Sequence, residues 1–339
     1  MRAPAFWRED GAAARLLSPL GALYGGIARK RLAREAPRAN LPTIVIGGLT
    51  AGGDGKTPLA IALARRLKAA GERPALLTRG YRRRRGGTSS FVVDLTHHGA
   101  DDVGDEALLL ARVAPTIVGA DRLASADLAR RLGATVVILD DGFHSRRIAA
   151  DLTLIVIDSD YGAGNGRCIP AGPLRAPLDA QLAAADILVV IGDGARARDI
   201  AMRANKPVFA ARLAPDANAA EAMQGTRVVA FAGIARPEKF FSLLEASGAE
   251  VAARVSFADH RRFTQRDYAM LSKLRQEQGA RLVTTEKDAA RMGGHLATLG
   301  VDKLPVTLVF DDAVVLDEAL RGLRKADEAR AFPILNRAS

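Results

Sequence analysis

Short apolar runs alternate with longer amphipathic stretches between residues 43 and 191. The apolar runs are rich in β-branched residues and predict buried strands at 43–46, 75–78, 116–118, 135–139, 152–157 and 187–191. Helices are predicted between them, at 58–70, 107–113 and 125–132. Strands that are apolar on both faces and alternate with helices predict an α/β fold, with a mostly parallel sheet covered by helices on both faces.

A second, smaller series of the same kind begins near residue 227. It predicts strands at 228–232, 251–257, 281–284 and 305–310, and helices at 237–246 and 265–278. We therefore divide the chain into a first domain at 1–212, a linker at 213–226, and a smaller α/β domain with a C-terminal helix at 227–339.

The first predicted strand and helix are joined by T-A-G-G-D-G-K-T-P, residues 50–58. This is the strand, glycine turn and helix of a P-loop, although the usual pattern has Gly at the position of Thr50. Glycines in such a turn let backbone N–H groups converge on phosphate oxygens. We expect a nucleotide to be bound by Thr50, Ala51, Gly52, Gly53, Asp54, Gly55, Lys56 and Thr57. Lys56 would reach the β- and γ-phosphates, and Thr57 would place its hydroxyl on Mg²⁺.

Carboxylates follow at two places in the first domain. Asp140 and Asp141 come directly after the apolar run at 135–139, where adjacent acids at the mouth of a parallel sheet repel each other and favour a cation. The alternative is a turn or a helix N-cap, because D-D-G is also good turn chemistry. Asp105 and Glu106 begin a predicted helix, which alone is an ordinary first-turn pattern.

The second domain carries one candidate for proton transfer, the Asp259–His260 pair. A lone histidine is more often structural than catalytic. Phosphoryl transfer to a hydroxyl nevertheless needs a group that accepts the hydroxyl proton, and His260 supported by a carboxylate would serve.

Charge narrows the range of partners. The 339 residues carry a net charge of +11 and a single cysteine, Cys168, which suits a reducing compartment. The charge predicts an anionic partner, unless it reflects a coding bias toward arginine. An apolar stretch at 16–28 is too short and too interrupted to span a bilayer. Because Arg29, Lys30, Arg31 and Arg34 follow it, the stretch predicts either an interfacial anchor or an amphipathic helix packed on the domain.

In this order the motifs resemble the tetraacyldisaccharide 4′-kinase family, the P-loop lipid A 4′-kinases. The first half carries the resemblance in L-L-S-P-L-G-A-L-Y-G-G-I-A-R (16–29), G-L-T-A-G-G-D-G-K-T-P (48–58), T-R-G-Y (78–81), V-G-D-E (103–106), D-D-G-F (140–143) and G-N-G-R-C-I-P-A-G-P-L-R (164–175). The second half carries it in F-A-G-I (231–234), F-A-D-H (257–260) and T-T-E-K-D-A (284–289). Many families share the P-loop alone, whereas P-A-G-P-L-R and T-E-K-D-A are specific to this one.

The resemblance implies a reaction and roles for the site residues. The γ-phosphate of ATP would pass to the 4′-hydroxyl of a tetraacylated glucosamine disaccharide 1-phosphate and give lipid IV-A. Asp105 and His260 would act together as the base, which requires the two domains to close over the substrate. Glu106, Asp140 and Asp141 would surround Mg²⁺ with Thr57. Family members usually have Ser or Thr at the position of Thr50, so this residue is normal there.

The same resemblance implies the partners and the location. The substrate is an anionic acylated disaccharide lipid, and the protein would lie peripherally on the cytoplasmic face of the bacterial inner membrane as a monomer, without nucleic acid. Arg79, Arg175 and the basic run at 82–85 are candidate contacts to substrate or lipid, and a solvated loop is the alternative for the run. Where the family commonly has Gln-His after D-D-G-F, this chain has His144 and Ser145, so the role of those positions is open.

Two other classes of protein fit less well. A P-loop GTPase needs an N-K-x-D motif to read guanine, and the chain has only A-N-K-P at 204–207, while a metallochaperone would need a cysteine cluster. An ATP-dependent nucleic-acid-binding protein would be expected to show an RRM, zinc or helix-turn-helix signature, and the sequence has none.

Overall fold

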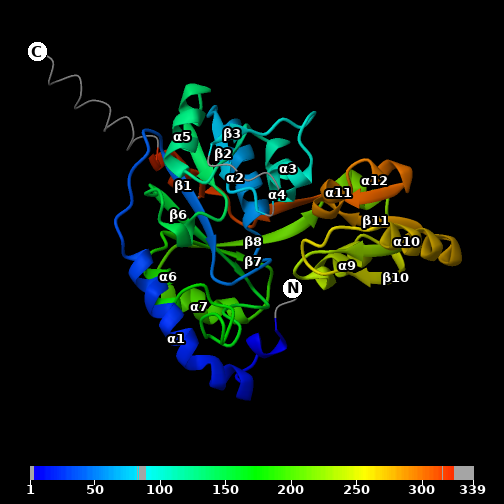
Figure 1. The fold of residues 1–339 in the computed structure, drawn as a ribbon, viewed down its shortest axis with the longest axis horizontal. Helices are drawn as coiled ribbons and strands as arrows, with labels where there is room; N and C mark the ends of the chain where they lie inside the picture. The colour runs from blue at the N-terminus through cyan, green and yellow to red at the C-terminus, as the bar shows by residue number, and fades with distance from the viewer. Residues whose placement is uncertain (1–3, 82, 84–88, 315, 324–339) are drawn as a thin grey trace, which may run out of the picture.

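Two sheets organise the chain, and each forms the centre of one domain (Figure 1). The computed structural model describes residues 4–81, 83, 89–314 and 316–323. The large domain has a nine-stranded sheet of order β13-β8-β7-β6-β1-β5-β2-β4-β3, and the small domain has a four-stranded sheet of order β10-β9-β11-β12. Neighbouring strands are parallel throughout, except that β13 and β3 run antiparallel to their neighbours at the two edges of the large sheet. The predicted α/β fold with a P-loop-type sheet is confirmed.

The bounds of the elements follow the predicted alternation closely. The strands are β1 (Thr43–Gly48), β2 (Pro74–Thr78), β3 (Phe91–Val92), β4 (Thr116–Val118), β5 (Val136–Leu139), β6 (Leu152–Asp158), β7 (Ile187–Ile191), β8 (Val208–Pro215), β9 (Arg227–Ala232), β10 (Glu250–Ser256), β11 (Arg281–Thr285), β12 (Val301–Leu304) and β13 (Val306–Phe310). The helices are α1 (Ala12–Leu32), α2 (Lys56–Ala69), α3 (Ala100–Val103), α4 (Asp105–Ala111), α5 (Arg122–Arg131), α6 (Leu178–Ala183), α7 (Arg196–Ala204), α8 (Ala217–Glu221), α9 (Pro237–Ala246), α10 (Gln265–Gln278), α11 (Glu286–Met292) and α12 (His295–Thr298). Short 3₁₀ turns are η1 (Ala5–Trp7) and η2 (Phe143–Ser145).

Both faces of the large sheet are buried, as its apolar strands require. One face packs against α2 and α4 through residues such as Leu63 and Leu110. The other face packs against α1, α5, α6 and α7 through residues such as Leu32 and Ala129. The parallel strands therefore point their carboxyl ends toward one edge, where ligands bind in open α/β sheets.

The chain crosses between the domains twice, and both crossings use the same edge of the large sheet. After β8 the chain passes through α8 into the small domain. It returns to the large sheet as β13, which runs antiparallel to β8 with Val306 opposite Pro215 and Phe310 opposite Ala211. Only Pro305 separates β13 from β12 of the small sheet. The sequence-based division placed the strand predicted at 305–310 in the small domain and residues 213–215 in the linker. The structure places residues 306–310 and 213–215 in the large sheet. The pattern of an apolar run predicts a strand but not the sheet that it joins.

The end of the described chain packs on the large domain as well. Residues 314 and 316–323 are helical, and Leu316, Leu320 and Leu323 join the core beneath α2. The Arg66 guanidinium of α2 donates to both carboxylate oxygens of Asp317, at 2.9 and 2.8 Å. The remainder of the predicted C-terminal helix, and Arg82, Arg84 and Arg85 of the basic run, lie outside the described residues.

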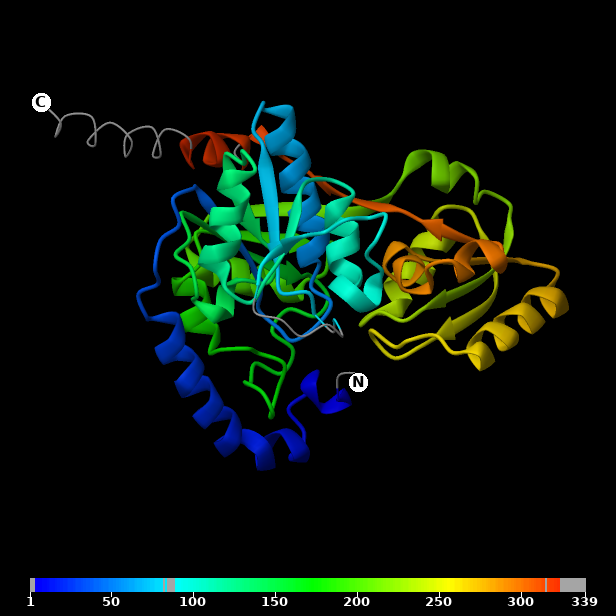
Figure 2. The same ribbon diagram turned by 45° about the horizontal axis from the view of Figure 1, so that its top comes forward.

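Helix α1 lies along the outside of the large domain, away from the small domain (Figure 2). Its buried face consists mainly of small residues, because a Cβ on Gly21 or Gly25 would come within 2.8 or 3.0 Å of Cys168. Its large apolar side chains point outward instead, and they include Leu16, which is 82% exposed. The described part of the chain contains no helix with the length and apolar character that a membrane crossing needs.

Candidate functional site

The P-loop lies at the carboxyl end of β1, between the sheet and the N-terminus of α2. Gly52, Gly53 and Gly55 have φ of 108°, 31° and 98°, which only glycine adopts readily, so the loop needs them to turn. The loop is held from outside by the segment 173–175. The N–H of Ala51 donates to the Pro173 carbonyl at 2.8 Å, and the N–H of Arg175 donates to the Leu49 carbonyl at 3.2 Å. The conspicuous P-A-G-P-L-R string is thus a support for the phosphate loop.

Lys56 begins α2 and lies among carboxylates. Burial lowers its pKa, but the charges of Asp141 and Asp54 raise it by more, so that the net pKa is above the ordinary value. Lys56 is therefore a cation under all ordinary conditions. Its place at the first turn of the helix, beside the glycine N–H groups, suits the phosphates of a nucleotide.

Thr57 and Asp140 meet directly. The Thr57 hydroxyl donates to Oδ2 of Asp140 at 2.9 Å, and Oδ1 of Asp140 is buried with no hydrogen-bond partner among the described residues. Burial, followed by the charges of Glu106 and Asp141, raises the pKa of Asp140 to about 7. A buried carboxylate with an unused oxygen and neighbouring acids is an environment that a cation would stabilise.

Glu106 and Asp141, the other two predicted metal ligands, are paired with basic side chains. Oε1 of Glu106 accepts from Nζ of Lys287 at 2.9 Å, and Asp141 forms an ion pair with Arg175. Across the residues that the structure describes, no three His, Cys, Asp or Glu side chains converge as a ready metal shell. Mg²⁺ does not require one, because it keeps several waters and usually takes one or two carboxylates together with substrate phosphates. Thr57 and Asp140 fit this requirement, with Glu106 and Asp141 nearby.

The two residues predicted to form the base lie in contact across the domain boundary. Nδ1 of His260 lies 3.1 Å from Oδ2 of Asp105, although 155 positions separate them in the sequence. Asp105 begins α4 and is 4% exposed. Burial raises its pKa, but the hydrogen bond with His260 and the charge of Lys287 lower it by more, to about 2. The carboxylate is therefore ionised and held by groups from the other domain.

Lys287 determines which ring nitrogen of His260 carries the proton. Burial lowers the pKa of Lys287, but Glu106, Asp105 and Asp259 raise it above its ordinary value, so the side chain is an ammonium. An ammonium only donates, and its Nζ lies 3.3 Å from Nε2 of His260. In the neutral ring Nε2 must then accept, which leaves Nδ1 as the donor to Asp105. Sequence reasoning quoted Lys287 within T-E-K-D-A but gave it no role.

Arg291 joins the same cluster from the next turn of α11. Its Nε lies 3.2 Å from Oδ2 of Asp105, and its Nη2 lies 2.8 Å from Oδ1 of Asp288. The side chain is 7% exposed, so both pairs are screened little by solvent. In the sequence, only its spacing could have indicated this role: Arg291 follows Asp288 by three residues and Lys287 by four, so all three share one face of α11.

The predicted substrate arginines differ in their surroundings. Arg175 is paired with Asp141, whereas Arg79 is exposed beyond the end of β2. A further arginine, Arg122, was missed. It is 1% exposed, and no described residue accepts a hydrogen bond from its Nη2. Burial and the charges of Arg79 and Arg147 lower its pKa to about 10. Arg79, Arg122 and Arg147 therefore form a positive cluster whose charge Asp140 and Asp141 offset only in part.

His144 occupies the position where the sequence departs from the family pattern. Its Nε2 lies 2.8 Å from Oε1 of Gln181, whose amide nitrogen donates to the carbonyls of Leu49 and Ala176. Burial, followed by the charge of Arg175, lowers the pKa of His144 to about 3, so the ring is neutral. Its role here is to brace the base of the P-loop through Gln181.

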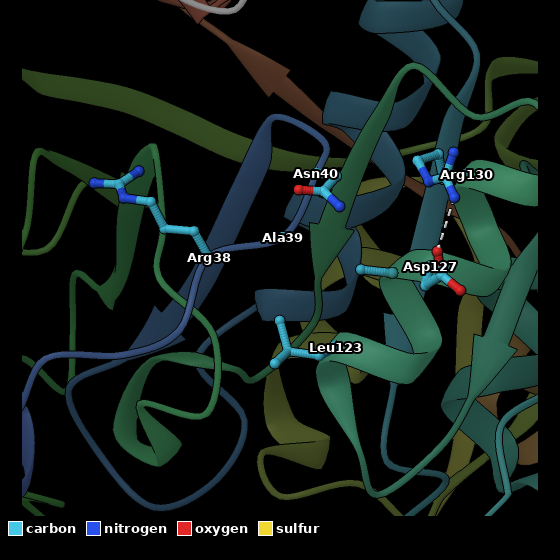
Figure 3. A pocket seen from close by; sticks show the side chains of 7 residues that line it. Arg38, Ala39, Asn40, Leu123, Asp127 and Arg130 are labelled. Carbon is cyan, nitrogen blue, oxygen red and sulfur yellow. Dashed lines mark hydrogen bonds and ion pairs between the residues drawn. The ribbon is translucent and has the colours of Figure 1, made fainter. Parts of the chain in front are cut away.

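A surface pocket elsewhere on the large domain does not belong to this site (Figure 3). It is lined by the segment before β1 and by α5, at Arg38, Ala39, Asn40, Leu123, Ala126, Asp127 and Arg130. Residues before β1 lie at the amino end of the parallel strands, opposite the P-loop. Arg38 pairs with Asp151 at 2.9 Å and Arg130 with Asp127 at 3.1 Å, so the cations of this pocket are already neutralised.

Comparison with known proteins shows the family of this chain. The family model described as "Tetraacyldisaccharide-1-P 4'-kinase" matches residues 13–324. The chain belongs to this family. A tetraacyldisaccharide 4′-kinase from Paramagnetospirillum magneticum is 50% identical over 315 residues, which cover 92% of this chain and 95% of that protein. One from Nitrobacter winogradskyi is 48% identical over 324 residues, covering 93% and 96%.

A solved structure of this tetraacyldisaccharide 4′-kinase fold is also similar. LpxK from Aquifex aeolicus, crystallised in complex with ATP, superposes with a TM-score of 0.69 at 24% identity. The match covers 91% of this chain and 99% of that chain, so both domains and their connection share the fold.

The raised pKa of Asp140 gives a testable consequence. Between its ordinary pKa of 3.8 and the folded value of about 7, the folded state holds a proton that the unfolded state has lost. Stability therefore falls as pH rises through this window, by up to about 4 kcal/mol, since one pKa unit is about 1.4 kcal/mol. In EDTA, Asp140→Asn should melt above the wild type at pH 8 and equal to it at pH 4. Millimolar Mg²⁺ at pH 8 should raise the melting temperature of the wild type and leave that of Asp140→Asn unchanged.

The exposed Asp179 provides the control for this experiment. Asp179→Asn should keep the pH profile and the Mg²⁺ response of the wild type, because its carboxylate lies on the surface. If the wild type and Asp140→Asn had equal pH profiles, Asp140 would not be the acid whose raised pKa lowers stability.

Proposed function

We propose that this protein transfers the γ-phosphate of ATP to the 4′-hydroxyl of a tetraacylated glucosamine disaccharide 1-phosphate, giving lipid IV-A. The observation that carries the proposal is the 3.1 Å contact of Asp105 with His260 at the mouth of a P-loop. Transfer to an alcohol needs such a proton acceptor in addition to a nucleotide site. Membership of the family supports the choice of acceptor, because the relatives carry the name of this activity.

Each group of the site has its own role in the proposed reaction. The N–H groups of the P-loop and Lys56 bind the β- and γ-phosphates of ATP. Thr57 and Asp140 would hold Mg²⁺, with Glu106 and Asp141 close by, and the bound ion would neutralise charge on the phosphates. Asp105 accepts the proton of the 4′-hydroxyl. Its low pKa of about 2 is compatible with this role, because phosphoryl transfer has a loose transition state in which the proton leaves late.

His260 orients the base. Because Lys287 fixes Nε2 as an acceptor, the Nδ1–H of His260 holds one carboxylate oxygen of Asp105 in place. The Glu106 N–H donates to the other oxygen at 3.0 Å. The pair therefore presents a carboxylate in one orientation, as an acceptor needs to do for a bound hydroxyl.

The positive cluster of Arg79, Arg122 and Arg147 supports an anionic acceptor. The buried Nη2 of Arg122 has no acceptor in the described structure, and a buried donor without a partner costs about 1–3 kcal/mol. A phosphate of the acceptor would neutralise the cluster through Arg79, its exposed member. We assign the 1-phosphate of the lipid to this cluster.

Helix α1 supports attachment to the cytoplasmic face of the inner membrane. Its outer face presents large apolar side chains along one stripe: Leu16, Leu20, Leu23, Tyr24 and Ile27. Its last turn carries Arg29, Lys30 and Arg31, and basic residues beside an apolar stripe favour an anionic lipid surface.

The central test is a lipid kinase assay. The purified protein with ATP, Mg²⁺ and the disaccharide 1-phosphate in detergent should yield a doubly phosphorylated lipid. Lys56→Ala should lower kcat about 100-fold or more, because it removes a charge aimed at the transferred group. Lys68→Ala, at the exposed other end of α2, should leave kcat unchanged. Absence of product from the wild type, or a normal kcat for Lys56→Ala, would refute the proposed function.

The Asp105–His260 pair should act as one unit. Asp105→Ala and His260→Ala should each lower kcat about 100- to 10,000-fold, the range of general base catalysis. The double variant should be no worse than the more severe single variant, because each substitution disables the same group. His295→Ala, in the same domain but stacked on Tyr268, is the control and should retain kcat. Additive losses would show instead that the two residues have separate roles.

The outward face of α1 should control binding to vesicles. The triple variant Leu16→Ser, Leu20→Ser and Leu23→Ser should lower the partition coefficient onto anionic vesicles about 100-fold, since each buried leucine contributes about 1 kcal/mol or more. The control replaces exposed apolar residues elsewhere, Leu95, Leu132 and Met202, with Ser. Flotation assays compare the two, and equal partitioning of both variants would remove α1 as the attachment face.

A further inference from the structure

A second contact between the domains lies directly on the P-loop. Arg236 belongs to the small domain, in the loop between β9 and α9, and its guanidinium reaches the large domain. Nη2 lies 3.3 Å from Oδ1 of Asp54 in the P-loop, and Nη1 pairs with Asp158 at the end of β6. The guanidinium also lies over the ring of Tyr161, 4.4 Å from its centroid. The side chain is 15% exposed, so these pairs are largely shielded from water.

The backbone beside Arg236 also touches the phosphate loop. A Cβ placed on Gly53 would lie 2.9 Å from Cβ of Ala235, and one on Gly52 would lie 3.7 Å from it. Both glycines have positive φ. The two central glycines of the P-loop therefore lie against the small domain, and any movement of that domain changes what the loop contacts.

Thr50 holds the carboxylate of Asp54, which pairs with Arg236. The Thr50 hydroxyl donates to Oδ1 of Asp54 at 2.6 Å, and the Thr50 N–H donates to Oδ2 at 3.2 Å. Thr50 is 1% exposed and Asp54 is 3% exposed. A glycine at position 50 would leave Asp54 without the hydroxyl. The substitution that makes this P-loop differ from the usual pattern thus serves the contact between the domains.

The loop between β9 and α9, which carries Arg236, also contacts the residues that hold Asp105. The Gly233 carbonyl accepts from the His260 N–H at 3.2 Å and from Nη2 of Arg291 at 2.7 Å, and the Gly233 N–H donates to Asp288 at 3.0 Å. Gly233 and Arg236 are three positions apart. The segment 233–236 therefore connects the P-loop, through Arg236, with His260 and Arg291, both of which hold Asp105.

We propose that Arg236 is a positioning residue for phosphoryl transfer, which locks the segment 233–236 against Asp54 and Asp158 and thereby aligns His260 with Asp105 when the nucleotide occupies the P-loop. The proposal rests on the proposed kinase function for its kinetic test. Arg236 acts through the segment and through His260, so its loss leaves the phosphate-binding N–H groups and Lys56 in place.

The kinetic test separates positioning from nucleotide binding. Arg236→Ala should lower kcat about 100-fold, the effect of displacing reacting groups by about 1 Å, while the KM for ATP stays within about threefold. Arg236→Lys should recover part of kcat, because one ammonium reaches one carboxylate but cannot bridge two. Asp158→Asn removes one charged partner of Arg236 and should also lower kcat while leaving the KM for ATP nearly unchanged. Agreement between the two variants would exclude a folding defect in one of them as the cause.

The matched control is Arg254→Ala. Arg254 also lies in the small domain and pairs with Glu245 and Glu238, but both acids are in the same domain. It should retain the kcat of the wild type. A kcat for Arg236→Ala within twofold of the wild type, a parallel loss of ATP affinity, or an equal loss in Arg254→Ala would each overturn the proposal.

A distance measurement tests the same contact without any lipid. Spin labels at Arg65→Cys on α2 and Lys273→Cys on α10, in a Cys168→Ser background, report the separation of the two domains. The unsubstituted pair and Arg254→Ala should give one narrow distance distribution, and Arg236→Ala should give a broader one. Identical distributions for all three would overturn the proposal. Because this measurement needs no substrate, its failure is distinguishable from failure of the kinase function.

Discussion

The structure depends on acids of the large domain that are neutralised by bases of the small domain. Asp54, Asp105 and Asp158 are each less than 5% exposed, and a buried carboxylate is costly unless it is paired. Their partners come across the domain boundary, in the pairs Arg236–Asp54, Arg236–Asp158, Lys239–Asp158, His260–Asp105 and Arg291–Asp105. Lys287 pairs with the more exposed Glu106 across the same boundary. The small domain is therefore required for the electrostatics of the nucleotide edge as well as for its shape.

Much of the fold could be predicted, because buried parallel strands have an unmistakable composition. The apolar runs and the glycine turn predicted β1, α2, β5 and β6 along the chain, but not the order of the strands within the sheet. The return of β13 to that sheet could not be predicted, because its pattern suits either sheet and its membership depends on pairing with β8. The direction of α1 was equally hidden. The sequence left open whether this stretch is an interfacial anchor or packs on the domain, whereas the structure packs Gly21 and Gly25 against Cys168 and leaves Leu16, Leu20 and Leu23 exposed.

Sequence reasoning named candidate site residues but could say little about their partners. The P-loop and the acids after β5 pointed to Thr57 and Asp140. Asp105 and His260 were brought forward by the resemblance to the family, because an acid in a first helical turn and a lone histidine are ordinary features by themselves. It could not show that Asp141, held at a φ of 58°, turns to Arg175, or that Glu106 turns to Lys287. The cations Arg236, Lys287 and Arg291 were overlooked because charged residues in or beside short helices usually face solvent. Their importance appears only when the opposite domain supplies buried acids.

The polar character of this interface has a consequence for turnover. An apolar contact accompanies the ion pairs, with Ala290 of α11 joining a cluster that includes Val103 and Leu108. Interfaces of this kind separate more easily than hydrophobic ones, because water can replace each ion pair in turn. A kinase that binds its nucleotide on one domain and orients its base from the other must open to exchange ligands, and two antiparallel strands, β8 and β13, are a connection that permits it. The same ion pairs that make the closed site competent therefore also make it reversible, since each is strong only while its carboxylate stays buried.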